Sequence, residues 1–226
     1  MPGFLRHCRG KDDHDQKQFH CPRALGKGGS GKTSTALALA SLAAAEGRRA
    51  IVLDADPQRS ASEWHAVSAN PAFAVHSTEV GAVAALLKRA KTRYDVVVID
   101  NPPARYSGST AIAERAGMSL ICARPFLFDI SLALEWVHVL KNAHTTPLVA
   151  LTAAPPLRLD MESPAVRIAR ERLKSAGATL WRHQITHRLA YPELIHRGMT
   201  IADLSAGAPA RTDYERLWSA ICRWKR

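Results

Sequence analysis

A short segment near the amino end, GKGGSGKT at residues 26–33, combines flexible glycines with two lysines and a threonine. The apolar run TSTALALASLAAAEG begins within it and predicts a helix closed by Gly47. Glycines let several backbone N–H groups converge on one point without side-chain clash. The positive end of the helix that begins near Lys32 aims at the same point. Together these features suit a bound polyphosphate.

The segment fits the phosphate-loop pattern GxxxxGK[ST] in full, and that pattern assigns roles to its residues. Lys32 is predicted to bind the β- and γ-phosphates of a nucleotide, and the Thr33 hydroxyl is predicted to ligate Mg²⁺. A chance glycine-rich turn would not need both of these residues at the start of a helix. The predicted nucleotide-binding residues are Gly26, Lys27, Gly28, Gly29, Ser30, Gly31, Lys32, Thr33 and Ser34.

Two predicted strands end in carboxylates, which a phosphate loop needs to hold Mg²⁺ and to position water. The first, RAIVLDAD, ends in Asp54 and Asp56. The second, YDVVVID, is an unbroken apolar run ending in Asp100, which predicts a strand covered on both faces. Either acidic motif alone is a weak signal, because acids often end strands. The three motifs occur in the order that one nucleotide site requires.

Helix-like and strand-like segments alternate from about residue 33 onward. This alternation predicts an α/β fold with a mostly parallel twisted sheet and helices on both faces, the P-loop NTPase fold. We expect residues 24–226 to form a single domain and residues 1–23 an irregular extension. The segment before the phosphate loop, DQKQFHCPRAL, has few apolar residues and contains Pro22. The first strand is therefore expected to be irregular or missing.

The chain is strongly basic, with a formal net charge of +11 and a pI near 10.0. This charge favours a polyanionic partner, either nucleic acid or an anionic membrane surface. No apolar run reaches the roughly 18 residues that span a bilayer, and the first twenty residues lack the apolar core of a secretory signal. The four cysteines form no CxxC pair, which argues against a disulfide framework. We expect a cytoplasmic protein.

The motifs resemble those of one known family, the ParA/MinD superfamily of deviant Walker A P-loop ATPases. KGGSGKT carries the family's extra lysine at Lys27, which in the family reaches the partner's nucleotide across an ATP-bound dimer. DADPQ, followed by Trp64, resembles the switch I motif, and this implies that Asp54 lies near Mg²⁺ and that Asp56 orients the attacking water. VVVID resembles Walker B, whose Asp100 would bind Mg²⁺ through water. The expected catalytic residues are Lys27, Lys32 and Asp56, and the expected metal ligands are Thr33, Asp54 and Asp100.

The resemblance covers residues 26–222 and is strongest to small plasmid-type ParA proteins. It implies an ATP-dependent homodimer that binds non-specific DNA on the nucleoid. A ParB-like partner would stimulate hydrolysis, and the cycle would drive plasmid or DNA segregation. Basic residues crowd the carboxyl-terminal half, where this family binds DNA, although a solvated helix face would look the same. They are Arg167, Arg170, Arg172, Lys174, Arg182, His183, His187 and Arg188.

Two other functions fit parts of the sequence. The last predicted helix, DYERLWSAICRWKR, has apolar residues at helical spacing and a basic end, as in a MinD-like membrane anchor. Packing of that apolar face on the sheet is the interpretation we favour, which makes a membrane partner unlikely. The atypical segment before the phosphate loop also suits a non-hydrolysing pseudo-ATPase that binds DNA or a partner.

Overall fold

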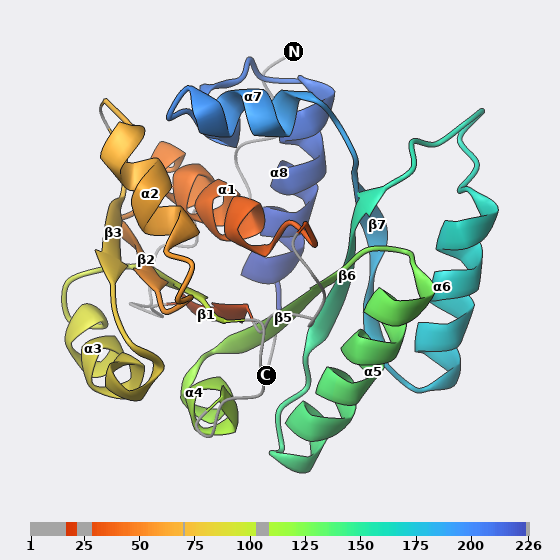
Figure 1. The fold of residues 1–226 in the computed structure, drawn as a ribbon, viewed down its shortest axis with the longest axis horizontal. Helices are drawn as coiled ribbons and strands as arrows, with labels where there is room; N and C mark the ends of the chain where they lie inside the picture. Colours follow the sequence, from red (N-terminus) through yellow and green to blue (C-terminus); the bar gives the residue numbers. More distant parts are fainter. Residues whose placement is uncertain (1–16, 22–28, 70, 103–108, 225–226) are drawn as a thin grey trace.

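The computed structural model describes residues 17–21, 29–69, 71–102 and 109–224. Within these residues a seven-stranded sheet runs through the molecule in the order β3-β2-β4-β1-β5-β6-β7 (Figure 1). Every neighbouring pair in it is parallel. The strands are β1 Lys17–Cys21, β2 Ala50–Asp54, β3 Ala74–Ser77, β4 Val96–Asp100, β5 Met118–Ala123, β6 Leu148–Ala154 and β7 Thr179–Thr186.

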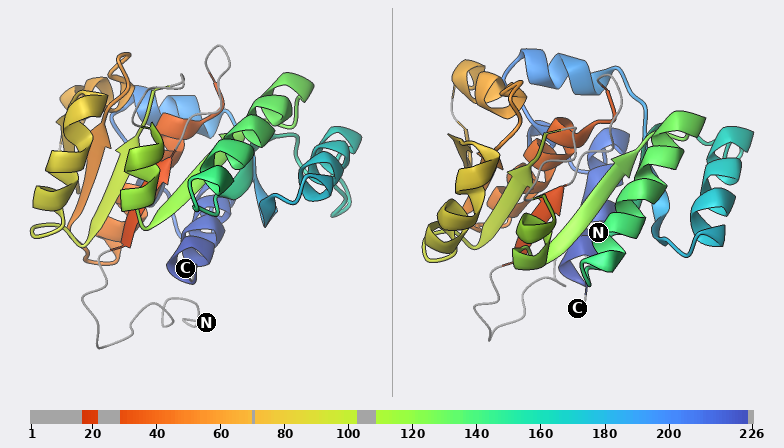
Figure 2. Two further views of the ribbon diagram at one scale, coloured as in Figure 1. Left: turned by 90° about the horizontal axis from the view of Figure 1, so that it is seen from below. Right: turned by 60° about the horizontal axis from the view of Figure 1, so that its bottom comes forward.

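Helices cover both faces of this sheet, as Figures 1 and 2 show. Helices α1, α2, α7 and α8 pack on one face, and α3 to α6 pack on the other. The sequence prediction of an α/β fold with helices on both faces is confirmed. The helices are α1 Lys32–Ala45, α2 Ser60–Val67, α3 Val83–Ala90, α4 Ser109–Arg115, α5 Leu127–Asn142, α6 Pro164–Ser175, α7 Ala190–His196 and α8 Pro209–Cys222, with 3₁₀ turns η1 Val80–Ala82 and η2 Ile201–Asp203.

Strand β4 shows how an unbroken apolar run serves two cores. Val96 and Val98 belong to the apolar cluster beneath α1 and α8, whereas Val97 and Ile99 belong to the cluster beneath α3. Successive side chains of a strand point to opposite faces, so both sets are buried only when helices cover both sides. All five residues of the strand are buried, as the sequence pattern predicted.

The first strand differs from expectation. Residues 17–21 lie inside the stretch expected to be irregular, yet they form β1 in the middle of the sheet, between β4 and β5. The strand ends at Cys21, before Pro22, so the proline removes no donor from its ladder. Backbone pairing with a strand on each side offsets the poor apolar pattern, because strand formation depends strongly on context. The assignment of residues 24–226 to one domain stays a prediction.

The last helix, α8, packs its apolar side against the sheet. Tyr214, Leu217, Trp218 and Ile221 are all buried and belong to the same cluster as α1. The Trp218 indole N–H donates a hydrogen bond of 2.9 Å to Oε1 of Glu46, just beyond the end of α1. The favoured interpretation of this helix as a packed element is therefore confirmed.

Candidate functional site

The second half of the phosphate loop leads directly into α1. Gly29 and Gly31 have φ values of +98° and +72°, a backbone region that side chains other than glycine rarely adopt. Helix α1 then starts at Lys32, whose side chain is buried. The loop therefore turns sharply and sets the amino end of the helix beside a buried ammonium group. Gly26, Lys27 and Gly28 lie outside the described residues.

Two threonines that no local motif indicates hold this loop in shape. The Thr152 hydroxyl, near the end of β6, donates a hydrogen bond of 2.8 Å to the carbonyl of Ser30. The Thr35 hydroxyl in α1 donates one of 2.6 Å to the carbonyl of Gly31. Loop carbonyls fixed in this way face into the protein, which leaves the amides on the other side of the turn for an anion. Sequence analysis missed both threonines.

The predicted carboxylates meet at the same edge of the sheet as the loop. Asp54 ends β2, Asp100 ends the neighbouring β4, and the two residues are partners in the parallel register. Oδ2 of Asp54 accepts hydrogen bonds from the Ser62 backbone N–H, at 2.9 Å, and from the Ser62 hydroxyl, at 2.7 Å. Oδ1 of Asp56 accepts one of 2.9 Å from the backbone N–H of Gln58. Ser62, at the start of α2, is a further residue that sequence analysis missed.

Asp100 is the most perturbed group of this site. It is fully buried, and burial raises the pKa of its carboxyl from an ordinary 3.8 to about 6. The Lys32 charge and the Thr33 hydroxyl oppose this rise in pKa, whereas Asp54 and Asp56 reinforce it. Electrostatic coupling of this kind requires proximity, so the structure brings these five predicted residues together. Their individual roles stay predictions.

The residues present fit a Mg²⁺ ion. Within the described part of the chain, neither carboxylate oxygen of Asp100 has a hydrogen-bond partner of good geometry, although both are buried. Buried acceptors of this kind normally have a partner. Mg²⁺ prefers oxygen ligands and keeps several waters while it binds one or two carboxylates and substrate phosphates. Asp100, the Thr33 hydroxyl and the nearby Asp54 supply a donor set of that type.

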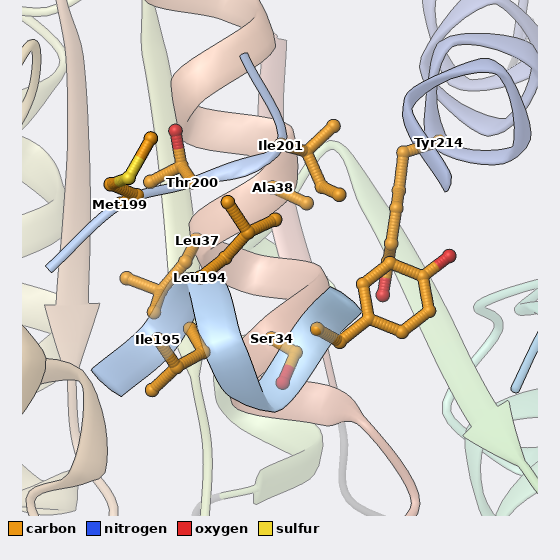
Figure 3. A pocket seen from close by; sticks show the side chains of 10 residues that line it. Ser34, Leu37, Ala38, Leu194, Ile195, Met199, Thr200, Ile201 and Tyr214 are labelled. Carbon is orange, nitrogen blue, oxygen red and sulfur yellow. The ribbon is translucent and has the colours of Figure 1, made fainter. Parts of the chain in front are cut away.

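The hollow beside α1 is too small to be the nucleotide site. A cavity of about 20 Å³ lies between α1, α7 and α8, room for about one water molecule (Figure 3). Leu37 and Ala38 of α1, Leu194 and Ile195 of α7, and Tyr214 of α8 are among its lining residues. A nucleotide is far larger than this cavity, so the cavity cannot hold one.

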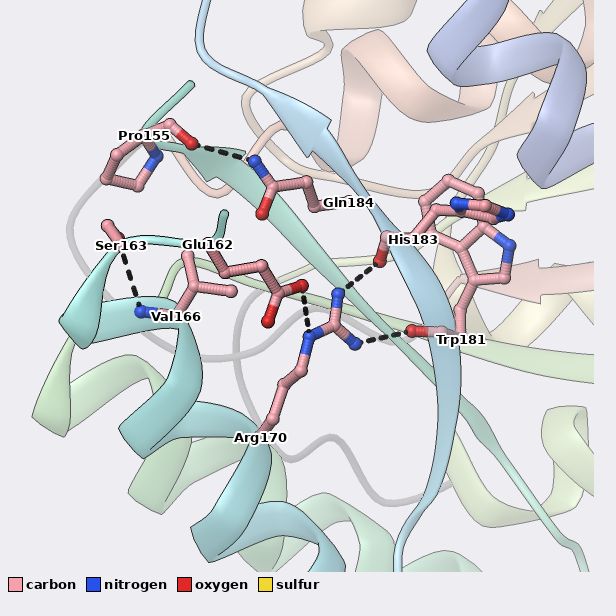
Figure 4. A network of polar contacts seen from close by, with 8 residues as sticks. All are labelled: Pro155, Glu162, Ser163, Val166, Arg170, Trp181, His183 and Gln184. Carbon is pink, nitrogen blue, oxygen red and sulfur yellow. Dashed lines mark hydrogen bonds and ion pairs between the residues drawn. The ribbon is translucent and has the colours of Figure 1, made fainter. Parts of the chain in front are cut away.

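The basic residues of the carboxyl-terminal half divide into two groups. Arg170 is buried and structural: it donates to Oε1 of Glu162 at 2.7 Å and to the carbonyls of Trp181 and His183 at 2.9 Å each (Figure 4). Arg188 pairs with Asp213 at 3.2 Å. The other group is exposed on α6, on β7 and just beyond β7, and consists of Arg167, Arg172, Lys174, Arg182 and His187.

Positive charge also gathers around His183 on β7. Burial, together with the charges of Arg182, Arg216 and Arg170, lowers the pKa of its imidazole below the ordinary 6.5. The ring is therefore neutral at pH 7, and the cationic character of this region comes from arginine and lysine. Within the described part of the chain, no helix has the length and apolar character needed to cross a bilayer.

Comparisons with known proteins agree with this geometry. Residues 24–201 match the family described as the CobQ/CobB/MinD/ParA nucleotide binding domain. The chain is 31% identical over 217 residues to maintenance of carboxysome distribution protein A from Gloeobacter kilaueensis, covering 89% of this chain and 93% of the relative.

Two solved structures illustrate the shared fold. Apo McdA from Cyanothece has a TM-score of 0.76 at 19% identity, over 91% of this chain and 99% of that chain. The cell division protein MinD from Aquifex aeolicus has a TM-score of 0.72 at 14% identity, over 93% and 98%. Solved relatives include complexes with ATP and with Mg-ADP, in agreement with ATP and Mg²⁺ as the cofactors of the family. The chain belongs to the ParA/MinD group of nucleotide-binding P-loop ATPases.

Proposed function

We propose that this chain is an ATP-dependent positioning ATPase: it binds ATP with Mg²⁺, dimerises, binds DNA without sequence preference and releases it on hydrolysis. One observation carries the proposal. Lys32, Thr33, Asp54, Asp56 and Asp100 gather at the carboxyl edge of β2 and β4, next to the amino end of α1. An acid cluster beside a buried lysine and a glycine turn suits a magnesium-bound polyphosphate.

Each residue of this cluster has a role that the resemblance to the ParA/MinD superfamily or the phosphate-loop pattern implies and that its position allows. The buried Lys32 ammonium would bind the β- and γ-phosphates at low local dielectric, where its charge is weakly screened. Thr33 and Asp100 would hold Mg²⁺, which when bound neutralises part of the phosphate charge. Asp54, fixed by Ser62, would accept hydrogen bonds from water around the ion. Asp56 would orient the attacking water.

The first strand supports an active enzyme over a pseudo-ATPase. A missing β1 would leave the phosphate loop without an anchor, but β1 pairs with both β4 and β5. Its last residue, Cys21, lies opposite Asp100, so β1 ends at the same edge of the sheet as the Walker B acid. Lys27 would complete the site from the partner protomer, which makes closure of the dimer depend on bound ATP.

DNA binding is proposed for the exposed basic residues rather than for the whole cluster. Three exposed side chains can reach DNA phosphates: those of Arg172, Lys174 and Arg182. The Arg170 guanidinium instead donates hydrogen bonds to Glu162 and to two carbonyls of β7. Contacts of this kind carry no sequence information and weaken steeply with salt. Together with the net charge of +11, they support a nucleoid-associated protein in the cytoplasm.

The cargo is the least constrained part of the proposal. The curated relative is named for carboxysome distribution, and the sequence resembles plasmid-type ParA proteins. We propose that a small ParB-like partner selects the cargo, a DNA element or a large protein body, and stimulates hydrolysis. A MinD-like membrane role is less well supported, because the apolar side of α8 is already buried in the core.

Assays of ATP binding and of phosphate release test whether the chain is an ATPase. We expect Lys32→Ala to abolish ATP binding, and we expect Asp56→Ala to stop hydrolysis while sparing ATP-dependent dimerisation. Wild-type chain that binds no ATP in the presence of Mg²⁺, while folded by circular dichroism, would contradict the ATPase.

DNA binding has its own test. A gel-shift assay with ATP should show DNA binding that weakens when Arg172, Lys174 and Arg182 are replaced together by alanine. Arg89→Ala is the control, since this exposed arginine lies on α3, which packs against β2 and β4, toward the other end of the sheet from α6 and β7. Equal affinity of the triple variant and the control would count against this DNA surface.

A further inference from the structure

Arg124 lies beside the phosphate loop and outside the phosphate-loop, switch I and Walker B motifs. It follows β5 directly, and β5 pairs with β1, the strand that precedes the loop. Its guanidinium is held in a fork by Asp129: Nε donates to Oδ1 at 2.8 Å and Nη2 donates to Oδ2 at 3.2 Å. Asp129 is buried in the first turn of α5. A fork held by two parallel bonds fixes the direction of the remaining guanidinium nitrogen.

That remaining nitrogen faces the loop. Nη1 of Arg124 lies 3.5 Å from the position that a Cβ on Gly29 would occupy. Gly29 is exposed, and helix α1 starts three residues later, at Lys32. The guanidinium therefore borders the turn whose amides are arranged for an anion. An arginine has five N–H donors, and the pair with Asp129 accounts for only two of them.

We propose that Arg124 contacts the nucleotide polyphosphate in cis, with Asp129 as its positioning residue; this rests on the proposed function above. Arg124 supplies a cation from the same protomer, in contrast to the cross-dimer role expected of Lys27. Its side chain is mostly buried, at 27% exposure, so its charge is less screened than that of a surface arginine. If the ion pair between Arg124 and Asp129 served only to hold α5 in place, the Arg124 guanidinium would not have to lie close to Gly29.

Nucleotide affinity of Arg124 variants tests the proposal. Titration calorimetry with MgATP would compare wild type, Arg124→Ala, Arg124→Gln and Arg124→Lys. Charge-assisted hydrogen bonds to phosphate are strong, so we expect the two neutral variants to bind about ten- to a hundredfold more weakly. Arg124→Lys should recover part of the loss, since it keeps the charge without the fork. Kd values of the neutral variants within about twofold of wild type overturn the proposal.

A matched control separates this effect from a general loss of positive charge. Arg89→Ala removes an exposed cation near the end of α3, which leads to the amino end of β4 and so to the opposite edge of the sheet. Its MgATP affinity should equal that of wild type. If Arg89→Ala weakens binding as much as Arg124→Ala, long-range charge explains the result and the proposal fails.

Asp129→Asn tests the positioning role. Alone, it should weaken MgATP binding less than Arg124→Ala does, because the cation remains but loses its fixed direction. In an Arg124→Ala background it should have no further effect, as expected when two residues act through one contact. An equal effect in both backgrounds would show that Asp129 acts through α5 instead. Wild type that binds no MgATP refutes the proposed function itself, whereas normal wild-type binding with an inert Arg124 refutes only this inference.

Discussion

Replacing Asp100 by asparagine should stabilise the nucleotide-free protein at neutral pH. The pKa of this carboxyl is about 6 in the folded chain, against an ordinary value of 3.8, so the folded state binds its proton more tightly than the unfolded state does. The resulting stabilisation is complete below pH 3.8 and is lost as the pH rises through 6. Asparagine resembles the protonated acid in shape and cannot ionise, so it escapes this loss.

The size of the effect follows from the shift in pKa. Each pKa unit corresponds to about 1.4 kcal/mol, so the rise from 3.8 to about 6 corresponds to about 3 kcal/mol. At pH 7.5 we therefore expect Asp100→Asn to raise the free energy of unfolding by about 3 kcal/mol. The gain should shrink on acidification and be small near about pH 4. The same change should impair Mg²⁺-dependent ATP binding, because this buried carboxylate is the group that would hold the ion.

Urea unfolding followed by tryptophan fluorescence, without nucleotide and with a chelator, measures this difference between about pH 4 and pH 7.5. Asp95→Asn is a control of opposite sign. A hydrogen bond from Arg49 is the largest influence that lowers the pKa of Asp95, so its contribution to stability is lost as the pH falls. If the gap between Asp100→Asn and wild type stays constant across this range, the buried carboxylate has a compensating partner and the reasoning is wrong.

Three further changes test the supports of the site and the packing of α8. Ser62→Ala removes the hydroxyl that holds Asp54 at 2.7 Å and should slow phosphate release about tenfold; an unchanged rate would show that the backbone N–H suffices. Thr152→Val removes the hydrogen bond to the Ser30 carbonyl and should weaken ATP binding by about 1 kcal/mol in calorimetry, and an unaltered Kd would count against loop bracing. Trp218→Ala should lower the free energy of unfolding by about 3–5 kcal/mol in urea, because it empties a buried site, and a loss below about 1 kcal/mol would contradict this packing.

The sequence predicts those parts of the fold that depend on local pattern. The helix after the phosphate loop, the strand that ends in Asp54 and the strand that ends in Asp100 are all found where their periodicity places them. Short elements escaped prediction. Strand β3 has only four residues, none of them buried, and helices α4 and α7 have seven residues each. Such elements form because they pack against a neighbouring strand or helix. The few residues of the element itself do not show which neighbour that will be.

The residues of the candidate site also fall into two groups, those that a local motif predicts and those that it does not. Lys32, Thr33, Asp54 and Asp100 belong to contiguous motifs, because phosphate and metal contacts require particular residue types at the ends of adjacent strands. The residues that hold them in place carry no such requirement. A threonine or a serine at the right distance suffices, and any nearby element can provide it. Position in space rather than position in the chain therefore identifies Ser62 and Thr152.

The remote supports also couple the site to the stability of the whole domain. Thr152 lies 122 residues from the Ser30 carbonyl that it binds, and the Tyr214 hydroxyl of α8 lies 3.4 Å from the Thr35 hydroxyl, 179 residues away. The shape of the phosphate loop therefore depends on β6 and on the docking of the last helix. Bound nucleotide should in turn stabilise those distant elements, since a ligand that binds only the folded state stabilises that state. Loosening α8 should thus weaken ATP binding even though none of its described residues belongs to the motifs of the site.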